Sequence, residues 1–426
     1  MQFPGFNHNA IIPYLIAIAY FFLIVEICLV MHSFLYARRE RKIKRPRYAP
    51  KAVIIAPHYG WDAQTEESVK ILLSQDYAGE HEVFFVTNAV GGSDYDSSYS
   101  HLGRLAQEHS HVRALLAPNV IDNSLPRSQK VQNLITAISE LPDDVEIIAF
   151  VDADVTVRED WLRLLVEPLQ DPRIGATVGA RFYYPHTLNL PSLVEAIWVN
   201  FQIGVQGDHR FTMVWGGSNA IRRELISDAD VLRRWENATI EDHNLTHAVR
   251  DSKLKVHFVP ECVVITHTAN RTWRQVLEFT NRQMIMTYRM GFPAQWGLSL
   301  VGLLPKALIV FASILLLPFY INWPFKFNQV FVLLALLIPF IEIHIYRIFS
   351  RNLPKVLRDM DGFRDNIRMT SFATPISMFV AGLNAVYTVF QDKIIWGGVR
   401  YRILSATACQ VLGRVPDATA EAEDNH

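Results

Sequence analysis

Four long apolar runs place the strongest constraint on how this chain of 426 residues can fold. One occupies residues 11–31, and the others occupy roughly residues 298–321, 330–349 and 372–390. A helix needs about 20 apolar residues to cross the hydrocarbon core of a bilayer, so each run is long enough to do so. The sequence therefore predicts a membrane-embedded protein with an N-terminal anchor and a C-terminal transmembrane region.

Basic residues beside these runs predict how the chain is oriented in the membrane. Residues 38–47 contain seven Lys or Arg against the single acid Glu40, and residues 347–368 form a second basic loop. Positively charged flanks stay on the cytoplasmic side. We therefore expect a multi-pass protein whose middle is cytoplasmic, in a bacterial inner membrane or an internal eukaryotic membrane. The last run contains Pro375 and Gly382, and it either crosses the bilayer or lies re-entrant near the interface.

The middle of the chain, residues 46–270, alternates between short apolar strands and helical segments. This alternation is typical of an α/β domain with a mainly parallel sheet. Ligands of such sheets bind at the carboxyl ends of the strands. The expected strands are 52–56, 82–87, 112–116 and 147–151, and the expected helices are 65–74, 97–108 and 128–139.

Two carboxylates, Asp152 and Asp154, follow the expected strand 147–151. Because side chains alternate along an extended chain, both point to the same side. Carboxylate oxygens are the ligands that Mg²⁺ and Mn²⁺ prefer, and such a cation in turn holds a phosphate-bearing substrate. The alternative is a plain turn, since Asp is a common turn residue. The pair therefore indicates a candidate metal site at the edge of the sheet.

Charge and cysteine content exclude other classes of function. The formal net charge is −1, so the chain lacks the basic field of a nucleic-acid-binding protein. Its cysteines, Cys28, Cys262 and Cys409, lie far apart and show neither metal-ligand spacing nor a disulfide framework.

Seven short motifs follow one another along the chain. They lie at residues 57–62, 73–77, 129–134, 151–154, 215–220, 240–242 and 396–402. Taken together in their order and spacing, they resemble membrane-anchored family 2 inverting glycosyltransferases, in the branch similar to ceramide glucosyltransferase. The resemblance covers about residues 10 to 405. It implies a type A glycosyltransferase domain with a mainly parallel sheet, flanked by transmembrane helices, that uses a UDP-sugar and a divalent metal, Mn²⁺ or Mg²⁺.

The resemblance implies a catalytic base and a loop beside it. Asp242 matches the general base, which removes the proton of the acceptor hydroxyl. It opens an expected helix, 242–250, where the helix dipole favours a carboxylate, although an N-cap is the structural alternative. Glu241 is expected to support the site. Trp215, Gly216 and Gly217 match a tight loop beside donor sugar and acceptor, where glycines admit close backbone approach.

Donor binding is assigned through the same resemblance and through the strand ends. Lys130 would add a positive charge near the diphosphate, and either Asp94 or Asp96 would contact the uracil. Either Arg282 or Arg289, seven residues apart on one helical face, could hold the diphosphate, unless they only meet lipid headgroups. Ile285 and Met286 depart from the family motif there, which weakens the case for a processive polymer synthase. The donor-binding candidates are Asp62, Asp94, Asp96, Lys130, Asp152, Arg282 and Arg289.

We therefore expect transfer of one hexose, glucose foremost, from a UDP-sugar to a membrane lipid acceptor with inversion, giving a β-linked glycolipid. A polysaccharide synthase or polyprenyl-phosphate sugar transferase is the enzymatic alternative, and a non-catalytic sugar-nucleotide-binding membrane protein is the other. The expected organisation is an anchor at 1–37, a cytosolic catalytic domain at 46–270, an interfacial helix at 271–296, a transmembrane region at 297–392 and a tail at 393–426 whose end is disordered.

Overall fold

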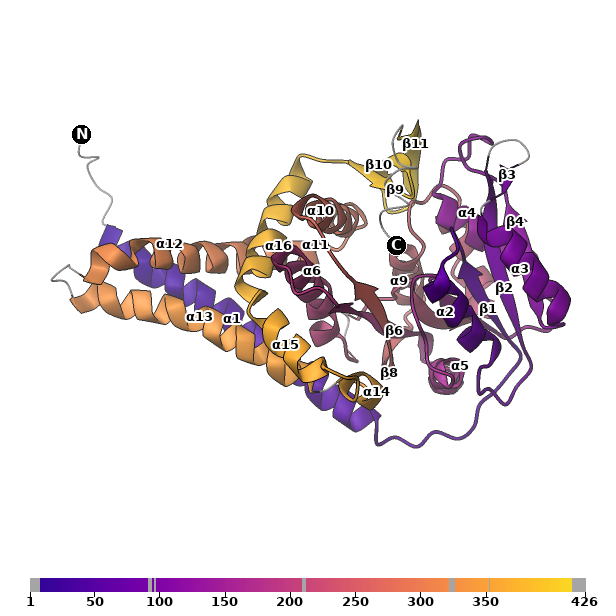
Figure 1. Ribbon diagram of the computed structural model, residues 1–426, viewed down its shortest axis with the longest axis horizontal. Coiled ribbons are helices and arrows are strands. Elements are labelled where there is room, and N and C mark those ends of the chain that lie inside the picture. The colour runs from indigo at the N-terminus through magenta and orange to yellow at the C-terminus, as the bar shows by residue number, and fades with distance from the viewer. Residues whose placement is uncertain are drawn as a thin grey trace.

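Three long apolar helices project from one side of an α/β domain in this computed structural model (Figure 1). The structure describes residues 8–90, 94–95, 97–208, 212–321, 326–351 and 353–415. Helix α1 (His8–Glu40) runs beside α12 (Leu304–Ile321) and α13 (Lys326–Ser350). Within the described residues, the segments long and apolar enough to cross a membrane are Pro13–Glu40, Pro293–Leu315 and Val332–Ser350.

A buried ion triad joins these three helices. Lys306 Nζ of α12 lies 2.6 Å from Glu26 Oε2 of α1 and 2.6 Å from Glu342 Oε1 of α13. All three side chains are buried. A charged group in an apolar environment has to be paired, so the triad fixes how the three helices align along their axes.

The last apolar run, residues 372–390, contains α16 (Thr374–Val389). The preceding helix α15 (Phe363–Ser371) meets α16 at an angle of 58°. The segment beyond α16 forms an antiparallel sheet that contacts the α/β domain, where Cys409 N donates to Asn237 O at 2.7 Å. By length and composition the bent helix pair fits a broken span or a re-entrant loop, so both alternatives for this run stay predictions. The strands of the small sheet are β9 (Lys393–Trp396), β10 (Val399–Ser405) and β11 (Ala408–Arg414).

The α/β domain is built on one sheet of eight strands in the order β3-β2-β1-β5-β7-β6-β8, with β4 beside β2. Pairs β1–β2, β2–β4, β1–β5 and β6–β8 are parallel, whereas β5–β7, β6–β7 and β2–β3 are antiparallel. The predicted mainly parallel α/β sheet flanked by apolar helices is therefore confirmed. The strands are β1 (Ala52–Pro57), β2 (His81–Val90), β3 (Asp94–Tyr95), β4 (Val112–Ala117), β5 (Ile147–Val151), β6 (Ile174–Pro185), β7 (Ser218–Arg222) and β8 (Lys255–Thr268).

Short helices cover the sheet, and further helices connect it to the membrane segments (Figure 1). On the domain they are α2 (Ala63–Leu73), α3 (Ser97–Glu108), α4 (Gln129–Ser139), α5 (Trp161–Val166), η1 (Glu167–Gln170), α7 (Glu224–Asp228), α8 (Val231–Trp235) and α9 (Asp242–Asp251). Towards the membrane segments they are α6 (Leu190–Asn200), η2 (Phe201–Val205), α10 (Trp273–Arg289), α11 (Pro293–Gly297), η3 (Leu298–Leu303) and α14 (Lys355–Arg358).

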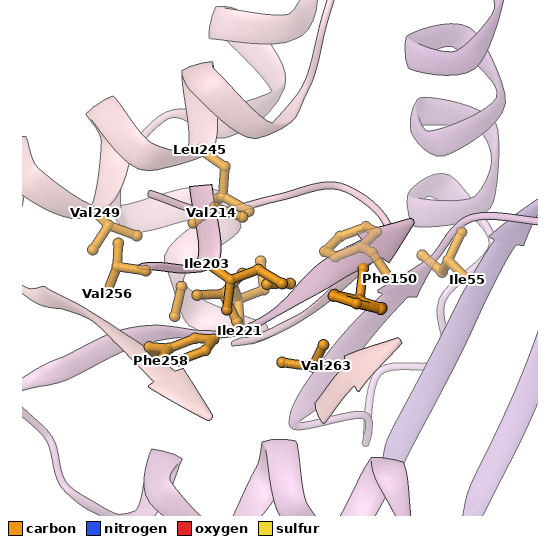
Figure 2. Packing of buried hydrophobic residues seen from close by; sticks show 14 of the residues in the cluster. Ile55, Phe150, Ile203, Val214, Ile221, Leu245, Val249, Val256, Phe258 and Val263 are labelled. Carbon is orange, nitrogen blue, oxygen red and sulfur yellow. The ribbon is translucent and has the colours of Figure 1, made fainter. Parts of the chain in front are cut away.

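Buried apolar side chains join helix α9 to the sheet. Leu245 and Val249 of α9 belong to the same buried cluster as Phe150 of β5 and Ile221 of β7 (Figure 2). Burying a Leu or Val side chain contributes about 1.5–3 kcal/mol, so this face holds the helix against the sheet. The first residue of α9, Asp242, is thereby held in place relative to the end of β5.

Candidate active site

The Asp-x-Asp pair follows the fully buried central strand β5. This strand lies between β1 and β7, so Asp152 and Asp154 emerge near the middle of the sheet edge. Lys130 approaches from the first turn of α4, a helix that Ser128 caps by accepting a hydrogen bond from Val131 N at 3.2 Å. Strand end and helix start thus bring opposite charges to one place.

Lys130 lies between two carboxylates from distant parts of the chain. Its Nζ atom is 2.6 Å from Asp152 Oδ1 and 2.6 Å from Glu241 Oε1. Burial alone would lower the pKa of Lys130, but the two carboxylates outweigh it and raise that pKa. Burial raises the pKa of Glu241, as do the neighbouring charges of Asp242 and Asp152, while Lys130 opposes the rise. Lys130 is therefore the cation that compensates the buried negative charge of Glu241.

Arg181 of β6 binds both members of the Asp-x-Asp pair. Its guanidinium donates to Asp154 through two nitrogens, at 2.9 and 2.8 Å, and to Asp152 Oδ2 at 3.1 Å. The guanidinium carbon lies 4.9 Å from the centre of the Trp215 ring, within cation–π range. The structure thus brings Arg181 to the candidate metal site.

Asp242 is the first residue of α9, and its carboxylate is held from two sides. Gly216 N donates to Oδ2 at 3.3 Å, and His243 contributes its backbone N at 2.6 Å and its ring Nδ1 at 2.8 Å to Oδ1. The residue at the N-cap position is Glu241, whose side chain caps nothing and pairs with Lys130 instead. Burial alone would raise the pKa of Asp242, but His243 and Lys130 outweigh it and leave that pKa below its usual value.

The loop Trp215-Gly216-Gly217 fills the space between these acids. A Cβ on Gly216 would lie 2.0 Å from Glu241 Oε1, and a Cβ on Gly217 would lie 2.1 Å from the Trp215 ring. The Gly217 position is also only 2.9 Å from Asp152 Oδ2. These are distances that real Cβ atoms do not adopt, so both glycines are required by close approach rather than by a turn type.

The other predicted donor residues lie in several places. Asp62 caps α2, accepting from Thr65 N at 2.6 Å. Asp94 is on the short strand β3, and Asp96 lies outside the described residues. Arg282 of α10 donates to Ile395 O of β9 at 3.3 Å, and Arg289 of α10 donates to Gln391 O, just before β9, at 3.0 Å.

Sequence reasoning did not assign a role in the site to Arg181 or His243. For Arg181 the available signal was its position inside the otherwise apolar segment 174–185, because a cation there needs a partner. For His243 the signal was its position directly after Asp242.

The Asp-x-Asp pair fits a divalent cation, because both of its carboxylates converge on one cationic group, the Arg181 guanidinium. Their hard oxygens suit Mg²⁺ or Mn²⁺. Across the described parts of the chain, no three His, Cys, Asp or Glu side chains come together to hold a metal ion. Further ligands would therefore be oxygens of the donor or of water.

An α/β sheet with acidic and basic side chains gathered beyond its central strand agrees with the class that the sequence motifs indicated, a glycosyltransferase. The glycosyl transferase family 21 model matches residues 15–409, and the chain belongs to that family. The match confirms the resemblance to the ceramide glucosyltransferase branch.

Two examples illustrate the solved structures that are similar to the chain. One is the mannosyltransferase PcManGT from Pyrobaculum calidifontis in complex with GDP-Man and Mn²⁺, 18% identical, covering 87% of this chain and 99% of that chain, with a TM-score of 0.43. The other is GalNAc-T7 with UDP, GalNAc and Mn²⁺, 12% identical, covering 58% of this chain and 51% of that chain, with a TM-score of 0.38. A search of curated proteins found no match.

Proposed function

We propose that this protein transfers one hexose, glucose foremost, from a UDP-sugar to a hydroxyl group of a membrane lipid, with inversion at the anomeric carbon. The product is a β-linked glycolipid. The observation that carries the proposal is that a single lysine and a two-glycine loop connect the Asp-x-Asp pair to the acids at the start of α9. Lys130 contacts Asp152 and Glu241, while Gly216 N donates to Asp242 and Gly217 lies against Asp152.

Each group has a separate task in this reaction. Asp242 takes the proton of the acceptor hydroxyl while the acceptor oxygen bonds to the anomeric carbon. The bond from that carbon to the diphosphate oxygen breaks, and UDP leaves with the bonding electrons. The low pKa of Asp242 keeps it ionised and ready to accept a proton at neutral pH. Lys130 places positive charge next to Asp152, where the diphosphate would gain charge.

A divalent cation bound by Asp152 and Asp154 would supply further charge stabilisation to the leaving diphosphate. The protein's own contribution is to hold both carboxylates at the end of a rigid central strand. Arg181 keeps them from repelling each other.

The acceptor is inferred from exposed apolar side chains on α6 and α10, two helices that both pack against α16. They gather at the N-terminal ends of α6 and α10, which are joined because Asn189 Nδ2 donates to Arg271 O at 2.8 Å. Such a surface fits contact with lipid better than contact with water. The exposed fractions are 47% for Leu188, 44% for Leu190, 40% for Trp273 and 39% for Leu277.

The test is transfer from radiolabelled UDP-glucose and UDP-galactose into total lipid extract by the purified protein, with Mn²⁺ or with EDTA. We expect one labelled lipid from UDP-glucose that is lost with EDTA. The variant Asp242→Asn should lower turnover by about 10²- to 10⁴-fold, the usual contribution of a general base, while UDP binding is retained.

Asp251→Asn is the matched control, because Asp251 ends the same helix and is exposed in a pair with Arg234. It should leave transfer unchanged. Full turnover by Asp242→Asn would refute the assignment of Asp242 as the general base. A ladder of sugar oligomers in place of a single lipid product would favour a polymer synthase. UDP release without any lipid product would refute the proposal that the acceptor is a lipid.

A further inference from the structure

Arg181 occupies the position at which the Asp-x-Asp pair would hold a cation. Three of the four carboxylate oxygens of Asp152 and Asp154 accept from its guanidinium, and the fourth faces Lys130. A divalent cation needs these same oxygens as ligands. Metal and guanidinium therefore cannot both keep the contacts that the structure contains.

The guanidinium is built into the site. Only 15% of the Arg181 side chain is exposed, and its face lies on the Trp215 ring. Its Nε atom is buried and has no hydrogen-bond partner among the described residues, so this donor is available to a further anionic group. A guanidinium binds phosphate in the same two-pronged way as it binds carboxylate. A diphosphate entering the site would thus offer Arg181 an alternative to Asp154.

The charges around the site favour the binding of a divalent cation in place of Arg181. Two cations, Lys130 and Arg181, contact three carboxylates, those of Asp152, Asp154 and Glu241, and a fourth, Asp242, pairs with His243. The ionised carboxylates outnumber the Lys and Arg cations, and this excess of negative charge favours a divalent cation. Asp154 is the carboxylate that the metal would reach first, since its side chain is 61% exposed against 19% for Asp152.

We propose that Arg181 is the resident counter-cation of Asp152 and Asp154, and that it competes with a divalent cation for them until a nucleoside diphosphate offers it another partner. The inference rests on the proposed donor site. Its consequence is that metal and donor bind cooperatively. By linkage, the donor then strengthens metal binding by the factor by which the metal strengthens donor binding.

The experiment measures Mn²⁺ binding to the purified full-length protein, by the electron paramagnetic resonance signal of free Mn²⁺, with and without UDP. The wild-type protein should bind Mn²⁺ weakly without UDP and about 10- to 100-fold more tightly with UDP. This range corresponds to the free energy of the charge-assisted hydrogen bonds that Arg181 exchanges. Arg181→Gln should bind Mn²⁺ without UDP about 10- to 100-fold more tightly than wild type, and UDP should then add little.

Arg173→Gln is the matched control, since it removes the same charge directly before strand β6, where the ion pair of Arg173 among the described residues is with Asp171. It should bind Mn²⁺ as wild type does. Arg181→Lys keeps the charge but cannot bridge two carboxylates, so its affinity for Mn²⁺ should lie between wild type and Arg181→Gln. This variant decides the question if Arg181→Gln does not fold.

The outcomes separate this inference from the proposed function. If Asp152→Asn abolishes Mn²⁺ binding but neither Arg181 variant binds Mn²⁺ more tightly than wild type, the competition is refuted and the metal site stands. If Mn²⁺ binding is the same in wild type and Asp152→Asn, the metal role in the proposed function fails together with the inference.

Discussion

Replacing Lys130 with methionine removes the only cation that contacts Glu241 among the described ion pairs. Lys130 Nζ is 2.6 Å from Glu241 Oε1, and the glutamate side chain is only 5% exposed. Removing one partner of a buried pair typically costs about 3–5 kcal/mol, because the remaining charge stays desolvated. In this protein the remaining charge also lies beside Asp152 and Asp242, which repel it.

Glu241 can avoid that cost by binding a proton, which makes the effect depend on pH. Burial already raises the pKa of Glu241 above its usual 4.5, and losing Lys130 raises it further. The folded state then holds more protons than the unfolded state, so the stability of Lys130→Met falls as pH rises from about 4.5 through the folded pKa. The slope reaches about 1.4 kcal/mol per pH unit.

The assay is thermal unfolding of the detergent-solubilised protein at pH 5.5 and pH 8. For a domain of 150–250 residues, 1 kcal/mol corresponds to about 2–4 °C, so we expect a loss of roughly 6–20 °C in Tm at pH 8. The loss should be clearly smaller at pH 5.5. Lys130→Met combined with Glu241→Gln should regain much of the loss at pH 8, because no unpaired charge remains. An equal loss at both pH values, without rescue in the double variant, would refute the reasoning.

Three further predictions concern other parts of the molecule. His243→Phe removes a contact that lowers the pKa of Asp242, so the acid limb of the kcat profile should move to higher pH, and an unmoved limb contradicts the assignment. Gly217→Ala should weaken UDP binding about tenfold or more by isothermal titration calorimetry, whereas Gly103→Ala, with open space at its Cβ, should not change it. Lys306→Met should cost about 3–5 kcal/mol in thermal unfolding because two buried glutamates lose their cation, and an unchanged Tm would show that the triad is dispensable.

Much of the fold could be predicted because the signals for it are local. The strand expected at 147–151 is the observed strand, and the helix expected from Asp242 begins at that residue. Continuous apolar runs and a charge at a helix start are properties of neighbouring residues, which the chain order alone displays. The proximity of Asp152 and Asp154 is local in the same sense, since one residue separates them, although the structure has a turn at residues 153–154 rather than the expected extended chain.

What the tertiary structure alone decided is which distant side chains meet. Arg181 reaches the Asp-x-Asp pair because β7 and β6 follow β5 in the sheet order. Lys306 contacts Glu26, 280 residues away in the sequence, because three helices pack together, and the C-terminal sheet contacts the α/β domain where Cys409 N donates to Asn237 O. Contacts of this kind depend on strand order and helix packing, which many sequence patterns share, so composition and spacing do not specify them. The sequence alone determined the type of fold and the candidate acids, and the tertiary structure decided which cations face those acids.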